Sequence, residues 1–145
     1  MTREPDQMAP QYFVYTGSEL LGYSLLERGA ATVLNRSGRF YPDEDYYKYA
    51  ETLIEHTEAM NDNYEEVVKA AYLGDDEYTH RAVKRYEKVS AQVAALNLFV
   101  ADERGRRLRA TEVRIDDYTA KYGDADEVWL EIVAEDQEAY DAFFS

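Results

Sequence analysis

One pair of residues in this sequence has the spacing of a metal-binding motif. Glu77 and His80 are three residues apart, so on a helix their side chains share one face. Carboxylate metal centres in helical bundles take two such pairs and two further glutamates, and this sequence has one pair. The chain has no cysteine, which excludes thiolate ligands and disulfides. We therefore predict no metal site and no other cofactor.

Signatures of phosphate loops and of serine nucleophiles are absent. The glycines are single and scattered, so neither GxGxxG nor GxxxxGK occurs, and GxSxG is also missing. His56 lies beside the apolar stripe of a predicted helix and is interpreted as a structural histidine. No catalytic residue is assigned, and the sequence favours a binding function over an enzymatic one.

Acidic side chains recur every three or four residues between residues 44 and 62, with a tyrosine among them. This spacing places them on one face of a helix. A solvated helix face is the simpler interpretation. In the alternative, the acids steer a basic partner to the surface and the tyrosine anchors it. The candidate partner-binding residues are Glu44, Tyr47, Glu51, Glu55, Glu58 and Asp62.

The chain is strongly acidic, with 30 acidic and 16 basic residues and a net charge of −14. Direct nucleic-acid binding is not expected, because phosphates are bound by lysine and arginine. A basic protein partner or nucleic-acid mimicry would suit such a surface, and salt adaptation would explain it equally well. Most basic residues lie between His80 and Ile115, where they either pair with acids of the same chain or bind an acidic ligand.

Tyrosine is unusually frequent, with 14 residues. Tyrosines at the edge of a core are the simpler interpretation, but they could also line a small-molecule pocket between sheet and helices. The candidate pocket residues are Tyr12, Tyr23, His56, Tyr86, Arg109 and Trp129.

The pattern of apolar and turn residues predicts a hairpin at the start of the chain. Its strands are residues 11–15 and 20–27, and Gly22 inside the second strand indicates a bulge or a close backbone approach. Residues 29–39 form a connection, with room for a short strand at 32–34.

Three helices are predicted next. The first extends from residue 42 to 60, Asn61-Asp62-Asn63 breaks the chain, and a shorter helix at 64–73 turns Tyr72 inward. The third follows Gly74 and continues to Asn97. Its apolar stripe is expected to pack on the sheet formed by the last three strands, and it consists of Tyr78, Ala82, Tyr86, Val89 and Val93.

The long helix leads directly into a second hairpin. Its strands are residues 98–101 and 108–115, with Gly105 in the turn and a bulge near Ala110 and Thr111. Residues 128–133 form the clearest remaining strand, and a helix over 135–144 closes the chain.

The segments Leu21-Gly22-x-Ser24-x-Leu26-Glu27 and Gly38-x-Phe40-x-Pro42-x-x-x-Tyr46 resemble the opening of some small uncharacterised bacterial proteins. The resemblance covers about the first third of the chain. It implies a bacterial origin and a hairpin at the start, and it implies no activity.

Together these patterns predict one α+β domain over residues 11–145 behind a flexible lead-in at 1–10. The predicted order is ββ-ααα-βββ-α, an antiparallel sheet with helices packed on one face. We expect a cytoplasmic binding protein with a protein partner, of the type of an immunity or inhibitor protein for a basic toxin or nuclease. The alternatives are a ligand-binding protein or enzyme with a tyrosine-lined pocket, and a structural or scaffold protein of phage or bacterial type. No membrane partner is expected, and a homo-oligomer is compatible with the sequence.

Overall fold

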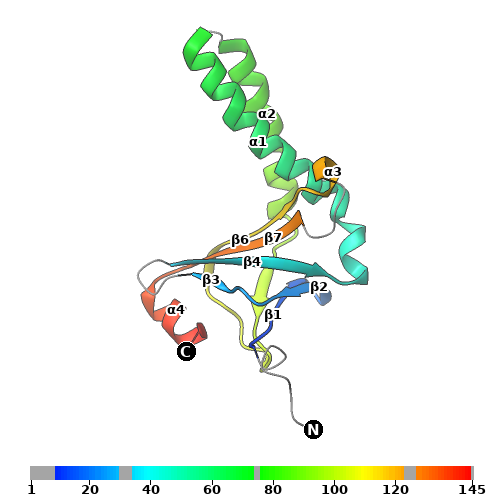
Figure 1. Ribbon diagram of the computed structural model, residues 1–145, viewed down its shortest axis with the longest axis vertical. Coiled ribbons are helices and arrows are strands. Elements are labelled where there is room, and N and C mark those ends of the chain that lie inside the picture. Colours follow the sequence, from blue (N-terminus) through cyan, green and yellow to red (C-terminus); the bar gives the residue numbers. More distant parts are fainter. Residues whose placement is uncertain (1–8, 30–33, 74–75, 123–126, 145) are drawn as a thin grey trace.

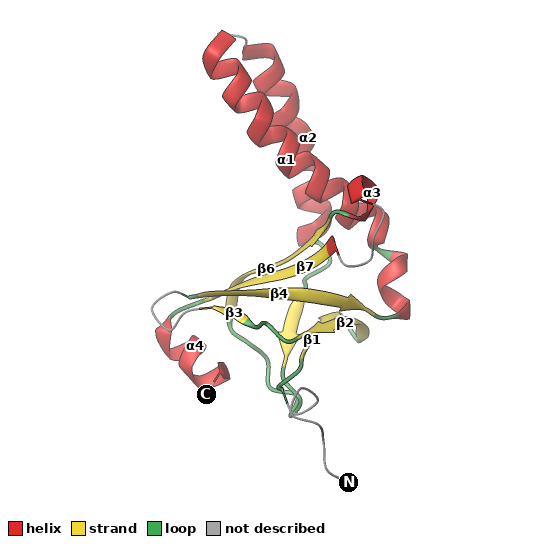
Figure 2. Cartoon of the chain, viewed as in Figure 1, coloured by secondary structure: helices red, strands yellow, loops and turns green. Residues whose placement is uncertain are grey.

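The structure is a computed structural model that describes residues 9–29, 34–73, 76–122 and 127–144. Its fold is α+β with an antiparallel sheet, and two long helices project from that sheet as a hairpin (Figure 1; Figure 2). The elements are β1 (Tyr12–Thr16), β2 (Glu19–Ser24), β3 (Arg28–Gly29), β4 (Asn35–Pro42), η1 (Glu44–Lys48), α1 (Ala50–Leu73), α2 (Asp76–Ala94), β5 (Phe99–Ala101), β6 (Ala110–Asp117), α3 (Thr119–Tyr122), β7 (Val128–Ala134) and α4 (Gln137–Phe144).

The strands pair in the order β5-β1-β2-β4-β7-β6, and β3 adds to β4. The two ends of this order also approach each other, because the Leu108 N–H donates to the Val100 carbonyl at 2.9 Å and Ala101 bridges Arg107. Alternating side chains therefore point into a shared interior, whose fully buried members include Val14, Leu21 and Phe40. α4 closes one end of this interior, with the Phe143 ring 5.5 Å from the ring of Tyr12.

The first hairpin predicted from the sequence is present, whereas the second is paired only next to its turn, where Ala101 bridges Arg107. Beyond that bridge β5 pairs with β1 and β6 pairs with β7, so the predicted pairing of residues 98–101 with 108–115 is wrong. Gly17 turns the first one with a φ of 58°, and a register shift between Val14 and Tyr15 disrupts its pairing opposite Gly22. A Cβ at Gly22 would lie 2.3 Å from the Tyr41 carbonyl oxygen, so the predicted close approach is confirmed. The bulge predicted near Ala110 and Thr111 is confirmed by a register shift between Ala110 and Glu112 in the pairing of β6 with β7.

The predicted order of elements is wrong at β4, which begins inside the segment interpreted as a connection and continues to Pro42. Its inward positions are filled by Gly38 and Phe40, whereas Arg39 and Tyr41 point to the other face. Gly38 has no side chain, so the alternation of apolar and polar residues that indicates a strand is not visible at this position. The short strand predicted at 32–34 falls largely outside the described residues.

The predicted helix break at Asn61-Asp62-Asn63 is also wrong. A short 3-10 helix, η1, precedes α1, which then continues unbroken to Leu73. Asparagine and aspartate only weakly disfavour helix interiors, and packing against a neighbouring helix overrides that preference. α2 supplies this neighbour, and its Arg85 binds Asp62 with an Nη1–Oδ2 distance of 2.7 Å.

The stripe of α2 packs mainly along α1, so its predicted packing on the sheet is wrong. Val89 is 1% exposed without belonging to the sheet core, and the Tyr86 ring stacks 5.8 Å from His56 of α1. Among the described side chains of the stripe, Val93, near the C-terminal end of α2, packs against the core of the sheet. α2 packs on α1 and not on the sheet because α1 itself is packed against β6. The side chain of Tyr78 falls outside the described residues.

No helix in the described part of the chain is long and apolar enough to cross a membrane.

Candidate functional site

The predicted partner-binding residues all lie on η1 and the first half of α1, and each is exposed. We call these residues, Glu44, Tyr47, Glu51, Glu55, Glu58 and Asp62, the acidic edge. Asp43 begins η1 by accepting the Glu44 N–H at 2.7 Å, which satisfies a donor at the start of the helix. The acidic edge therefore extends from the side of the sheet onto the projecting hairpin (Figure 1).

Only the outer end of the acidic edge is neutralised by a neighbouring base. Arg85 of α2 lies 2.7 Å from Asp62 and 3.7 Å from Glu58. In the described part of the chain, no base forms an ion pair with Glu51 or Glu55. Their negative charge is therefore available to a partner.

Tyr47 is the exposed aromatic residue of the acidic edge, with 66% of its surface accessible. It follows Tyr46, which is 1% exposed and donates its hydroxyl to the Asp117 carboxylate at 2.5 Å. Burial, together with this hydrogen bond, raises the pKa of Tyr46, so the hydroxyl keeps its proton. Tyr46 therefore anchors η1, the element that carries Tyr47, to the end of β6.

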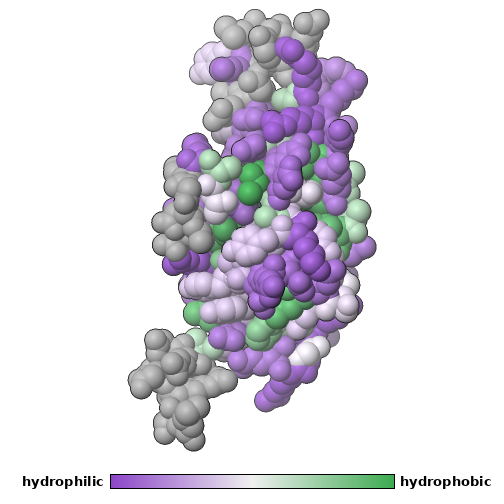
Figure 3. Space-filling view, turned by 90° about the vertical axis from the view of Figure 1, so that its right-hand side faces the viewer, coloured by the Kyte–Doolittle hydropathy of each residue, from purple (hydrophilic) through white to green (hydrophobic). Residues whose placement is uncertain are grey.

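Two further exposed tyrosines lie on α1, and Tyr72 shares the helix face of the acidic edge, whereas Tyr64 follows Asp62 by two residues and lies on another face. Tyr64 is 73% exposed and Tyr72 is 88% exposed, so the prediction that Tyr72 points inward is wrong. Its spacing contained the signal, because steps of three and four residues from Glu51 lead through Asp62 and Lys69 to Tyr72. Figure 3 shows that the projecting end is mainly hydrophilic where it is described.

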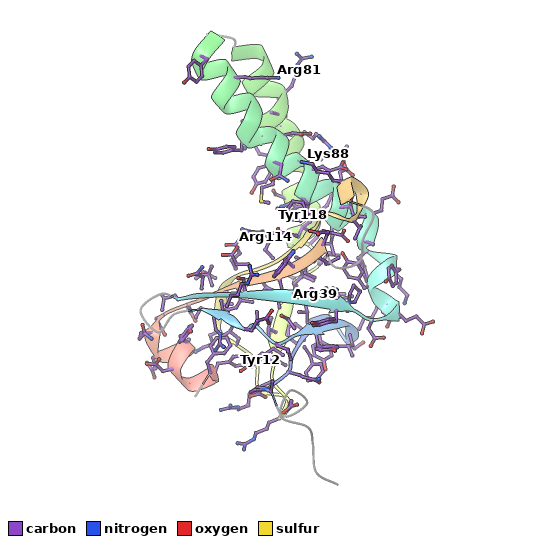
Figure 4. The ribbon with its side chains drawn as sticks, in the orientation of Figure 1. Tyr12, Arg39, Arg81, Lys88, Arg114 and Tyr118 are labelled. Atoms are coloured by element: carbon purple, nitrogen blue, oxygen red, sulfur yellow. The ribbon has the colours of Figure 1, made fainter. Side chains whose placement is uncertain are left out.

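The candidate pocket residues do not converge on one cavity. Tyr12 contacts α4 at the end of the sheet opposite the helical hairpin (Figure 4). Arg109 forms an ion pair with Glu135, with an Nη1–Oε2 distance of 3.7 Å. Tyr23 and Trp129 lie on the outer face of the sheet. Among the described residues, His56 and Tyr86 line a common cavity.

That cavity lies between α1, the lower end of α2 and β6, and it has a volume of about 350 Å³. Its polar lining residues include His56, Ser90 and Arg114. The Nδ1 atom of His56 and the Oγ atom of Ser90 are buried without a hydrogen-bond partner. Burial lowers the pKa of His56, and the nearby Asp116 only partly opposes this effect, so the ring is neutral at pH 7.

Most arginines of the basic segment between His80 and Ile115 pair within the chain, as one of the two sequence interpretations expected. Arg106 binds Asp102 with an Nε–Oδ2 distance of 2.7 Å, and Arg114 binds Asp116 with an Nε–Oδ1 distance of 2.8 Å. Arg81 lies toward the tip of the helical hairpin, well away from Arg114, and Lys88 lies between them (Figure 4). Arg107 differs, because its guanidinium lies 3.7 Å from the centre of the Phe99 ring.

In the described residues, no three histidine or carboxylate side chains are grouped so that they could hold a metal ion. The side chain of Glu77 falls outside the described part, and His80 is exposed. No protein-family model matches the chain, and no curated protein or solved structure is significantly similar to it.

Proposed function

We propose that this chain is a cytoplasmic binding protein that recognises a basic protein partner through the acidic edge. The observation that carries the proposal is the exposure of Tyr47, at 66%, beside the unpaired carboxylates of Glu51 and Glu55. Exposed tyrosine with surrounding charge is the composition of binding hot spots, in which the aromatic ring supplies contact energy and the charges accelerate encounter.

The position of the acidic edge on the molecule also supports this proposal. α1 has 24 residues and is therefore about 36 Å long. Much of this length extends beyond the sheet, so a partner can contact α1 without interference from the rest of the fold (Figure 2). Tyr72, on the same helix face, offers a further aromatic contact toward the tip. An immunity or inhibitor role against a basic toxin or nuclease is the form of this function that best suits the acid and tyrosine content.

The test is affinity capture from native lysate with three baits at 50 and 300 mM salt. The triple variant Tyr47→Ala/Glu51→Lys/Glu55→Lys removes the proposed anchor and reverses two charges. The matched control, Glu138→Lys/Asp141→Lys, makes the same charge change on α4. We expect a basic protein to be captured by the wild type and by the control, and to be lost with the triple variant.

The captured protein is then purified and titrated against each bait. A loss of affinity of about 10-fold or more for the triple variant alone is expected, because hot-spot residues contribute at least about 2 kcal/mol each. The proposal fails if no partner is captured at either salt concentration. Equal capture by all three baits would also refute it, since the acidic edge would then be irrelevant to binding.

A second candidate function, small-ligand binding, is favoured by the cavity between α1, α2 and β6. Two unsatisfied polar atoms, His56 Nδ1 and Ser90 Oγ, belong to its lining. A buried polar atom without a partner costs stability, and a bound polar ligand would remove that cost. A thermal-shift screen with neutral polar fragments tests this function. A fragment that stabilises the wild type and not His56→Phe or Ser90→Ala supports it, and a screen without such a fragment argues against it.

A further inference from the structure

The outer face of the sheet carries aromatic side chains from five neighbouring strands, several of them in ring contact across a strand pair. Three aromatic pairs lie opposite each other in the strand registers. They are Phe99 and Tyr15 on β5 and β1, Phe13 and Tyr23 on β1 and β2, and Tyr23 and Tyr41 on β2 and β4. The corresponding ring centres are 5.3, 6.5 and 4.9 Å apart. Trp129 lies on the same face of β7, where its register partner on β4 is Arg39. These six residues are partly exposed and lie outside the core cluster. We call them the aromatic face.

Arginine side chains lie on this face. The guanidinium of Arg107 is 3.7 Å from the Phe99 ring centre, that of Arg28 is 4.7 Å from Trp129, and that of Arg39 is 5.3 Å from Tyr41. In the described part of the chain, no carboxylate forms an ion pair with Arg28 or Arg107. This is unexpected in a chain with 30 acids and 16 bases, where Arg85, Arg106 and Arg114 are all paired.

We propose that the aromatic face binds single-stranded nucleic acid. Bases stack on aromatic rings without regard to sequence, and arginine offers both a planar stacking surface and a charge for phosphate. Neighbouring strands are about 4.8 Å apart, so the four gaps from β5 to β7 span roughly 19 Å. This width suits the few nucleotides that a small sheet module contacts.

The net charge of −14 led to the opposite expectation, because it averages over the whole molecule. The carboxylates of the acidic edge lie on η1 and α1, separate from the aromatic face. Arg28 and Arg107, for which no ion pair is found among the described residues, place positive charge at the two ends of the aromatic face. Repulsion by the remaining surface is long-ranged and is screened at physiological salt, where the Debye length is about 8 Å. Binding is therefore expected at moderate affinity, and it is independent of the protein partner of the acidic edge.

Fluorescein-labelled oligothymidylate of 15 nucleotides is the probe, followed by fluorescence anisotropy at 50 to 300 mM salt. The single tryptophan, Trp129, gives a second readout, since a stacked base quenches its fluorescence. We expect saturable binding with quenching, and weaker binding to a duplex of equal length. The logarithm of affinity should fall with the logarithm of salt concentration with a slope of about −2, because each neutralised phosphate of a single strand contributes about −0.7.

Variants separate stacking from charge. Tyr23→Ala and Phe99→Ala should each weaken binding about 5- to 100-fold, whereas Tyr23→Phe keeps the ring and should retain the affinity. Arg107→Gln should make the salt slope shallower by about 0.7. Lys88→Gln removes an exposed positive charge on α2, away from the aromatic face, and is the control that should bind like the wild type.

The proposal is overturned if the wild type neither binds the oligonucleotide nor loses tryptophan fluorescence at 50 mM salt. Equal affinity of Tyr23→Ala, Phe99→Ala and the wild type would also overturn it. Self-association in sedimentation experiments that is lost in Tyr23→Ala, without any oligonucleotide binding, would identify the face as an interface between two copies and so refute the nucleic-acid assignment.

Discussion

At the scale of single residues, two neighbours on α2 have opposite environments. Val89 is 1% exposed, whereas Lys88 is exposed and lies beside it in the chain. Val89→Asp places a charge between the helices and should lower the free energy of unfolding by several kcal/mol, on the order of 3. Lys88→Asp should change it by less than about 1 kcal/mol. Thermal or denaturant unfolding of both variants measures the difference, and equal small effects would mean that the buried face of α2 is assigned incorrectly.

His56 should make stability depend on pH near neutrality. Its pKa in the folded protein is lowered, chiefly by burial, whereas the unfolded chain has a pKa of about 6.5. Between pH 7.5 and 5.5 the unfolded state therefore takes up more protons at this position, and stability falls as the pH falls. His56→Gln should flatten this dependence, measured by urea unfolding across that range. His80→Gln, at an exposed position, is the control, and an unchanged slope in His56→Gln would contradict the prediction.

At the scale of elements, one hydrogen bond connects η1 to the end of β6. Tyr46 donates to Asp117, which is itself 2% exposed and also accepts the Thr119 N–H at 2.9 Å. Tyr46→Phe removes a donor from a buried carboxylate and should cost about 1–3 kcal/mol of stability. The same change at the neighbouring exposed residue, Tyr47→Phe, should cost less than about 0.5 kcal/mol. Denaturant unfolding distinguishes them, and similar values would show that the bond does not stabilise the fold.

At the scale of the whole molecule, the net charge of −14 should destabilise the folded state by self-repulsion. The Debye length falls from about 30 Å at 0.01 M salt to about 10 Å at 0.1 M and 3 Å at 1 M. The melting temperature should therefore rise with sodium chloride over this range. A variant with Glu44, Glu51 and Glu55 changed to Gln should show a smaller rise. A flat curve for the wild type would mean that internal pairing already balances the charge.

Features set by local chemistry followed from the sequence. The turn at Gly17, the close approach at Gly22 and the bulge near Ala110 each depend on a few consecutive residues. β7 was equally clear, because Val128, Leu130 and Ile132 alternate with outward residues and are all buried. The exposure of the acidic edge followed from its helical spacing.

Pairings between distant segments were decided only by the tertiary structure. An apolar stripe on α2 must be covered, but periodicity does not say whether α1 or the sheet covers it. β4 has little apolar alternation of its own and becomes a strand because β2, β3 and β7 pair with it. The aromatic face combines residues from 13 to 129, which sheet register alone brings together. The spacing of residues shows which of them share a face within one helix or strand. It does not show which strands will be hydrogen-bonded neighbours, because strands far apart in the chain can pair.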